Sequence, residues 1–159
     1  MNQLQVISDK LMDELSAQAG TSPRLRKNRN LHVREQEPCN RLLNAAEPGT
    51  YIMPHCHSEP SKDETMIILR GRMGILTFDG HGNLVDKVLI EAGTQNVGVN
   101  IPHGVFHSMV ALDPGTVIFE AKAGPYRPLQ QNEIATWSPA DGSEEATAWL
   151  EEMRRLFVV

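Results

Sequence analysis

Apolar and polar residues follow a helical period at both ends of this chain. Over residues 2–19 the apolar side chains recur every three or four positions, and Gly20 follows them. This spacing predicts an amphipathic helix that ends at the glycine. Residues 144–157 repeat the pattern, with Leu150 and Met153 among the apolar positions, and predict a closing helix. The pattern between these two segments is different.

From about residue 31 to residue 122, short β-prone runs alternate with turn residues. The expected strands are residues 51–54, 66–69, 74–78, 84–90 and 116–121. Between two of them, the Asp-Gly-His-Gly-Asn sequence at residues 79–83 is typical of a hairpin connection. Many short strands at this spacing are typical of an antiparallel sandwich or barrel. The pattern therefore predicts a mainly β protein with a helix at each end.

Composition limits the architecture and the class of partner. A chain of 159 residues with 40% hydrophobic content is suited to one domain. A formal charge of -5 argues against nucleic acid and anionic membranes as partners, because those surfaces bind cationic proteins. The N-terminus resembles no secretory signal and no apolar run approaches the roughly 18 residues of a membrane span, so we expect a cytoplasmic protein. Cys39 and Cys56 are too few for a disulfide framework, and we expect free thiols.

One basic run departs from this acidic average. It consists of Arg24, Arg26, Lys27 and Arg29. The simplest interpretation is a solvated loop or a contact between subunits, because runs of charge usually lie in water. The alternative interpretation is a subsite for a phosphate or a carboxylate group of a ligand.

Three histidines and a glutamate are spaced so that the expected strands would bring their side chains to one point. In a strand, His55 and His57 would share one face while Cys56 points away. An antiparallel return would place Glu64 beside that pair, and His107 follows a turn in a distant part of the chain. Three imidazoles and one carboxylate suit divalent Fe, Mn, Ni, Co or Zn. We therefore predict one divalent transition metal on His55, His57, Glu64 and His107.

These residues resemble both conserved motifs of the cupin superfamily. The first motif is a glycine, five residues, His-x-His, three or four residues, a glutamate, six residues and a glycine; its counterparts are Gly49, His55, His57, Glu64 and Gly71. The second motif, Pro-x-Gly-x-x-His, is matched by residues 102–107. The resemblance implies a single-domain cupin, with an antiparallel β-barrel or jelly roll. The expected division is a helical segment at residues 1–22, the barrel at 23–126 and a C-terminal extension with a helix at 127–159.

One interval departs from the first motif. Six residues, instead of three or four, separate His57 from Glu64, so Glu59 and Asp63 are alternative carboxylate ligands. We prefer Glu64, because only this residue keeps the six-residue interval to Gly71.

Parts of the chain resemble one group of cupins more narrowly. Residues 41–71, 78–83 and 119–126 are similar to the WbuC-type cupin metalloproteins. That resemblance implies a link to bacterial surface-polysaccharide biosynthesis. Similarity to cupins also implies a homodimer joined through the barrel edges.

Further polar residues are candidates for the rest of the site. By strand parity Tyr51 shares the side of His55, and a late strand carries two charged residues on one face. A glutamate and a lysine held near a metal can act as general acid and base. The candidate catalytic residues are Glu120, Lys122 and Tyr126, and the candidate substrate-binding residues are Arg41, Tyr51 and Lys62. A structural ion pair or hydrogen bond is the alternative role for each.

Two functions fit this sequence. In the first, a metal-dependent enzyme, such as an isomerase, an epimerase or a dioxygenase, acts on a small oxygen-rich substrate, a sugar or an organic acid. In the second, the barrel is a non-catalytic binding or accessory protein whose metal helps to fold and shape the pocket. In both, the expected partner is a small molecule.

Overall fold

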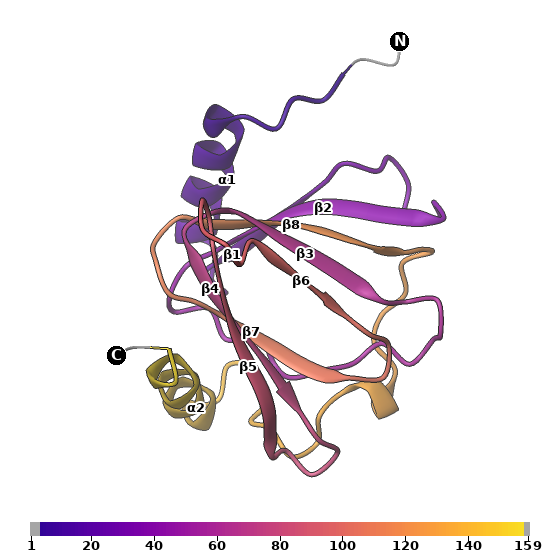
Figure 1. Cartoon of the computed structure of the whole chain (residues 1–159), viewed down its shortest axis with the longest axis vertical. Helices are drawn as coiled ribbons and strands as arrows, with labels where there is room; N and C mark the ends of the chain where they lie inside the picture. Colours follow the sequence, from indigo (N-terminus) through magenta and orange to yellow (C-terminus); the bar gives the residue numbers. More distant parts are fainter. Residues whose placement is uncertain (1–3, 158–159) are drawn as a thin grey trace.

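Two antiparallel β-sheets face each other and enclose the core. A computed structural model describes residues 4–157. Its strands form a five-stranded sheet in the order β1-β2-β8-β3-β6 and a three-stranded sheet in the order β5-β4-β7. Figure 1 shows one helix, α1, beside the larger sheet and the other, α2, beside the smaller one.

The strands are short, as the sequence predicts. The larger sheet contains β1 (Arg26–Asn30), β2 (Cys39–Ala46), β8 (Thr116–Ala123), β3 (Glu64–Arg70) and β6 (Gly98–Ile101). The smaller sheet contains β5 (Leu84–Glu91), β4 (Arg72–Phe78) and β7 (Phe106–Ala111). All paired strands run antiparallel. The mainly β, antiparallel architecture is therefore confirmed.

The inner faces of the two sheets meet in one apolar cluster. Met66 and Ile68 of the larger sheet pack there with Met73 and Met109 of the smaller sheet. Because side chains alternate along a strand, every second residue of β3 lies on this inner face. The same alternation that buries Met66 and Ile68 turns Glu64 inward, where its exposed fraction is only 2%.

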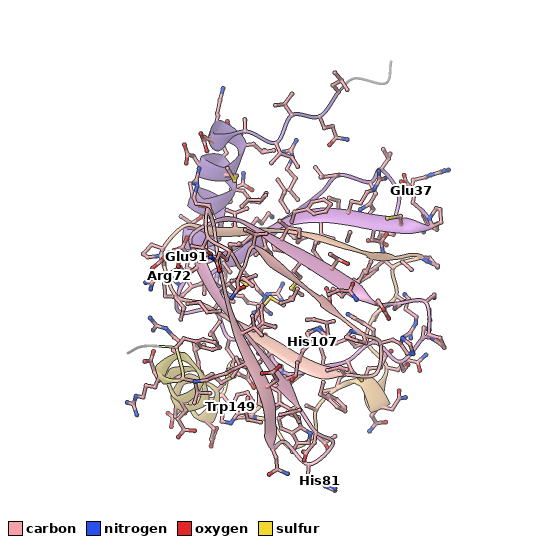
Figure 2. All side chains as sticks on the ribbon, viewed as in Figure 1. Glu37, Arg72, His81, Glu91, His107 and Trp149 are labelled. Carbon is pink, nitrogen blue, oxygen red and sulfur yellow. The ribbon has the colours of Figure 1, made fainter. Side chains whose placement is uncertain are left out.

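The predicted hairpin connects β4 and β5. One carboxylate oxygen of Asp79 accepts hydrogen bonds from the N–H groups of His81 and Asn83, at 2.8 and 2.9 Å. Gly82 has a φ of 88°, and the ring of Trp137 lies against the place where a Cβ would stand. A glycine is needed there because other residues rarely adopt this conformation. His81 marks the tip of the hairpin in Figure 2.

Each helix begins at a serine cap. α1 (Asp9–Thr21) follows Ser8, whose hydroxyl accepts a hydrogen bond from the Leu11 N–H at 3.3 Å. α2 (Glu144–Arg155) follows Ser143, whose hydroxyl accepts one from the Ala146 N–H at 3.2 Å. These bonds satisfy N–H groups that have no partner within the helix. The N-terminal helix therefore starts later than predicted: residues 4–8 are not helical, and residues 2 and 3 lie outside the described residues.

The C-terminal helix lies against the smaller sheet. Leu150 of α2 packs with Leu76 of β4 and Val110 of β7. Trp149, labelled in Figure 2, stacks on Phe78 with the ring centroids 5.6 Å apart. The C-terminal extension thus shares an apolar cluster with the smaller sheet.

One expectation about strands is wrong, and another holds only in part. Residues 51–54 form no regular strand, and His55 makes only isolated bridges with His107 and Ile134. The basic run is a loop only in part: Arg24 lies in an exposed turn, whereas Arg26 begins the edge strand β1. Its Arg-Lys-Asn-Arg-Asn sequence has little β propensity, and pairing with β2 overrides that local preference.

The structure also bears on the expected absence of a membrane span and on the state of the two cysteines. No helix in the described part of the chain has the length and apolar character needed to cross a bilayer. Both cysteines are free thiols, with Cys39 exposed and Cys56 buried.

Replacing Leu150 by alanine tests whether the packing of α2 on the smaller sheet stabilises the protein. Leu150 is 4% exposed and packs against two strands, so Leu150→Ala should lower the free energy of unfolding by about 2–4 kcal/mol. Urea unfolding followed by tryptophan fluorescence measures the change. Leu156→Ala is the matched control, because Leu156 is 39% exposed and should cost less than about 1 kcal/mol. Equal losses in the two variants would show that α2 packing contributes nothing.

Candidate metal centre

A backbone bridge holds His55 beside His107. The His55 N–H donates to the His107 carbonyl at 3.1 Å, and the His107 N–H donates to the His55 carbonyl at 2.9 Å. The two imidazole rings therefore lie with their centroids 4.6 Å apart. The next residue, Cys56, donates its N–H to the Glu133 carbonyl at 2.9 Å and buries its side chain outside this cluster.

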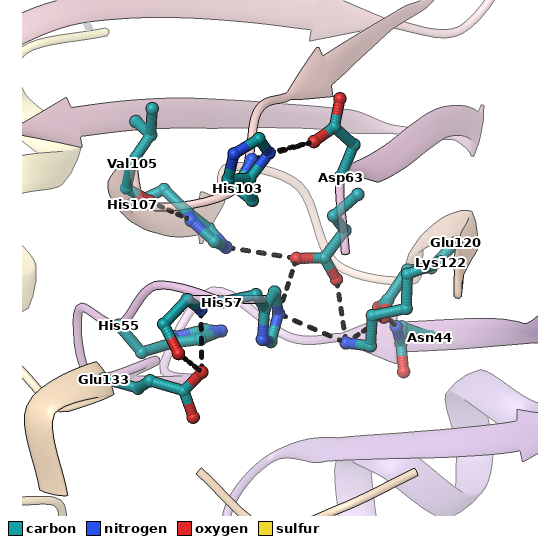
Figure 3. A network of polar contacts seen from close by, with 12 residues as sticks. Asn44, His55, His57, Asp63, His103, Val105, His107, Glu120, Lys122 and Glu133 are labelled. Carbon is teal, nitrogen blue, oxygen red and sulfur yellow. Dashed lines mark hydrogen bonds and ion pairs between the residues drawn. The ribbon is translucent and has the colours of Figure 1, made fainter. Parts of the chain in front are cut away.

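Glu64 joins the imidazoles from the first position of β3. One of its carboxylate oxygens, Oε2, lies 3.2 Å from Nε2 of His57 and 3.2 Å from Nε2 of His107. His55 completes the group: one ligand atom from each of the four residues lies within 4.8 Å of the others. In Figure 3, dashed lines mark the contacts of His57 and His107 with the Glu64 carboxylate. Residues far apart in the sequence thus form one compact group of donors.

Backbone carbonyls orient two of the imidazoles. Nδ1 of His55 donates to the Met53 carbonyl at 3.0 Å, and Nδ1 of His107 donates to the Val105 carbonyl at 2.9 Å. With the proton on Nδ1, the lone pair of Nε2 is free to bind a cation. Metal-binding histidines are usually fixed in this way through their second nitrogen. The donor set and its orientation therefore fit a divalent transition metal.

The charge states of these ligands also suit a cation. Burial, together with the neighbouring His107, lowers the pKa of His55 to about 4, so the imidazole is neutral at pH 7. Burial opposes ionisation of Glu64, but its close contacts with the His107 and His57 imidazoles and the charge of Lys122 outweigh burial and hold its pKa well below the usual range. A neutral imidazole and an ionised carboxylate are the forms that bind metals.

A lysine and a second glutamate extend the cluster along β8. Nζ of Lys122 lies 3.1 Å from Glu64 and 2.8 Å from Glu120. The Asn44 side-chain amide donates to the other oxygen of Glu120 at 2.6 Å. Burial and the charge of Glu64 raise the pKa of Glu120 to about 8. Burial lowers the pKa of Lys122, but the two carboxylates outweigh it and hold that pKa above its usual value.

The alternative carboxylate ligands point elsewhere. Glu59 forms an ion pair with Arg127, and Asp63 lies 2.9 Å from Nδ1 of His103. Neither belongs to the group of four donors that includes Glu64. The preference for Glu64, based on its interval to Gly71, therefore agrees with the geometry.

The cluster opens onto two cavities. One, of about 210 Å³, is lined by His55, His57 and Lys122 together with the candidate residues Lys62 and Tyr126. The other, of about 330 Å³, occupies the space between the sheets and also reaches His55, Glu64, Glu120 and Lys122. The predicted polar residues of β8 thus lie where a small molecule would meet the cluster.

Two candidate substrate-binding residues lie away from these cavities. The Tyr51 hydroxyl donates to the Pro139 carbonyl at 2.9 Å, and its ring packs edge-on against Trp149 of α2. The strand parity used to place Tyr51 fails because residues 51–54 form no regular strand. Arg41 alternates with inward-facing neighbours on β2 and forms an ion pair with Glu37. Neither side chain reaches the four donors.

Sequence reasoning missed a buried brace behind His57. Glu133 is 1% exposed and accepts hydrogen bonds from the Ser58 N–H and hydroxyl, both at 2.7 Å. Arg127 binds both oxygens of the same carboxylate, at 2.8 and 2.9 Å. These bonds attach the residue after His57 to the C-terminal extension. The nearest sequence signal is the Arg-Pro pair at residues 127–128, which carries no recognisable motif.

Solved structures with a similar fold include two small bacterial proteins. KdgF from Halomonas sp. has a TM-score of 0.51 at 17% identity, over 67% of this chain and 85% of that chain. The conserved protein SPY1581 of unknown function from Streptococcus pyogenes has a TM-score of 0.53 at 13% identity, over 80% and 93%. A mutant of oxalate decarboxylase OxdC from Bacillus subtilis has a TM-score of 0.50 at 21% identity, over 63% of this chain but only 26% of that chain.

Fold and cluster together define the class of this protein. KdgF and oxalate decarboxylase are cupin-fold proteins, so the predicted cupin fold is confirmed, and the three histidines and glutamate form a cluster suited to a metal. Residues 7–90 match the family described as a domain of unknown function, DUF6016, and the chain belongs to that family. No curated protein matches the sequence significantly.

Replacing Glu133 by glutamine tests the brace behind His57. Hydrogen bonds from Arg127 hold the pKa of Glu133 well below its usual range, so ionised Glu133 stabilises the folded state above the unfolded pKa of about 4.3. Glu133→Gln should therefore cost about 1.5–3 kcal/mol at pH 7. The difference from wild type should shrink as the pH falls below about 4.3, because the contribution of the carboxylate is lost towards the folded pKa.

Urea unfolding in the presence of a chelator, at several values between pH 7 and pH 3.5, measures this difference. Glu145→Gln is the matched control, since Glu145 is exposed in the first turn of α2. A loss of stability that is the same at every pH would contradict a role for the carboxylate charge.

Proposed function

We propose that this cupin is a metal-dependent enzyme that acts on a small oxygen-rich substrate, a sugar or an organic acid. One observation carries the proposal: Lys122 stands between Glu64 and Glu120, at 3.1 and 2.8 Å, on the wall of a cavity that also reaches His55. A purely structural metal site is usually closed by its protein ligands and has no such charged cavity beside it.

We assign the metal ligands as His55, His57, Glu64 and His107. Divalent Fe, Mn, Ni, Co and Zn all suit these donors, and a bound ion supplies Lewis-acid polarisation of a substrate oxygen. The two Nδ1 hydrogen bonds to Met53 and Val105 support this assignment, because they direct the Nε2 lone pairs of His55 and His107 towards Glu64. Glu133 holds the loop after His57 in place through Ser58.

The residues of β8 supply the remaining roles. The Lys122 ammonium orients an anionic or hydroxyl oxygen of the substrate, and Glu120 exchanges a proton with it through Oε1 or Oε2. Asn44 fixes the Glu120 carboxylate by its hydrogen bond of 2.6 Å. Tyr126 is 54% exposed, and with Lys62 it lines the smaller cavity, where both would contact the substrate. Groups held near a reacting atom in this way contribute general acid–base catalysis.

A non-catalytic binding or accessory role is the second candidate. It is favoured by the ion pair between Lys122 and Glu64, because this pair balances the charge of the carboxylate and gives Lys122 a structural role that needs no catalysis. Turnover separates the two roles: the metal-loaded protein is incubated with a panel of sugars and organic acids and followed by NMR. New product signals support the enzyme, and line shifts without products support the binding protein.

The finer family assignment rests on sequence resemblance. We propose that the protein is a WbuC-type cupin linked to bacterial surface-polysaccharide biosynthesis, and that it works in the cytoplasm. The division into residues 1–22, 23–126 and 127–159 follows the same resemblance.

We also propose a homodimer joined through the barrel edges. Static light scattering that gives one chain per particle at working concentration would reject this dimer.

Metal analysis tests the proposed ligands. Protein purified without an affinity tag should contain close to one transition metal ion per chain, because the four donors are oriented together. His57→Ala and Glu64→Ala should each lower metal content more than about tenfold, as each removes one donor and disturbs the other three. Elemental analysis measures the content and identifies the ion.

The matched control is His81→Ala, which removes a histidine from the exposed hairpin and should leave metal content unchanged. Circular dichroism checks that each variant is folded. A wild-type protein that is folded, free of metal and unable to take up added Fe, Mn, Ni, Co or Zn would reject the metal-dependent function.

A further inference from the structure

The cavity between the sheets has two ends with different chemistry. It is lined by His55 and Glu64 of the candidate metal centre, and also by Arg24 and Arg26. The strand register separates these groups, because Arg26 is level with Thr116 of β8 through β2, whereas Glu64 is level with Lys122. These levels are six residue steps apart along β8, which is about 20 Å of strand. The cavity therefore extends along the inner face of the larger sheet.

The two arginines are cationic groups with few partners. Arg26 donates to the Tyr51 carbonyl and, at a long 3.4 Å, to Asp141. Within residues 4–157, no carboxylate forms an ion pair with Arg24. Burial lowers the pKa of Arg26 and the charge of Arg24 lowers it further, whereas Asp141 raises it, so Arg26 lies within range of the positive charge of Arg24. An anion between them would relieve this repulsion.

The charge of the whole cavity favours the same kind of ligand. Its four cationic side chains are Arg24, Arg26, Lys27 and Lys122, and its two carboxylates are Glu64 and Glu120. A divalent ion on the histidine cluster would add further positive charge. Cavities with a net positive charge attract anions and increase their local concentration.

The middle of the cavity is lined by neutral groups. Asn28 and Asn44 present amides, while Ile52, Met109 and Ile118 present apolar surface. Amides bind hydroxyl groups, and apolar side chains cover the C–H faces of a carbon skeleton. The volume of about 330 Å³ is large enough for one small molecule of this kind.

We propose that Arg24 and Arg26 form an anion subsite, which holds a carboxylate or phosphate group at the end of a hydroxylated ligand. The other end of that ligand lies towards His55 and Glu64, so the assignment of the ligand's orientation rests on the proposed function. The substrate class is then a sugar acid or a sugar phosphate, not a neutral sugar. Guanidinium groups bind both carboxylates and phosphates through paired hydrogen bonds, so the same two arginines suit a sugar acid and a sugar phosphate.

Isothermal titration calorimetry with three matched probes tests the subsite. Glucose, glucuronate and glucose 6-phosphate share one ring and differ in the terminal group. Metal-loaded wild-type protein should bind at least one anionic probe about tenfold or more tightly than glucose, and the tighter of the two identifies the natural anion. Arg24→Met and Arg26→Met should each weaken that probe about tenfold and leave the affinity for glucose unchanged.

Arg29→Met is the matched control, because Arg29 lies on the same strand but lines a different pocket beside α1. It should leave all three affinities unchanged. Arg24 is exposed, so its variant tests the subsite even if loss of the Arg26 contacts to Tyr51 and Asp141 impairs folding.

Two results would overturn the subsite. One is equal affinity for all three probes, or no binding of either anion at 10 mM. The other is a loss in Arg29→Met as large as the loss in Arg24→Met. Repeating the titration on metal-free protein separates this inference from the proposed function. Anion binding that needs Arg24 but no metal supports the subsite, whereas the proposed function is tested by metal content and turnover.

Discussion

The carboxylate of Glu64 is the interaction on which the organisation of this protein depends. It is almost completely buried, and such a charge is tolerated in an apolar core only when it is paired and hydrogen-bonded. The partners come from three separate parts of the chain: His57, His107 and Lys122. Satisfying one buried charge therefore brings the loop after residue 54, β7 and β8 to the same point between the two sheets.

The candidate site was predictable where a residue's role follows from its spacing along the chain. His55, His57 and His107 fit short motifs with fixed intervals, and Glu64 could be chosen over its neighbours by its distance to Gly71. Tyr51 was misplaced because its position was inferred from strand alternation in a segment held by isolated bridges. Alternation is a property of regular strands, and it gives no guidance where the backbone leaves that geometry.

Other features of the fold arise from pairing over long distances in the chain. The strand β1 is rich in arginine and asparagine, and only its register with β2 shows that Arg26 faces the cavity. The anchoring of Ser58 could not be predicted either. Glu133, which Arg127 holds by an ion pair, contacts Ser58 across 75 positions of the chain. Local preference and periodicity describe single elements, whereas these contacts exist only in the assembled structure.

The contact between Ser58 and Glu133 also has a consequence for how the protein is made. During synthesis the N-terminal part of a chain leaves the ribosome first and can begin to fold. His55, His57, Glu64 and His107 all emerge before Glu133, which closes the loop after His57 from the C-terminal extension. A nascent chain that ends before residue 133 would contain all four residues of the candidate metal centre but an unanchored loop. The residues of the cluster are therefore complete before the contact that anchors the loop after His57 can form.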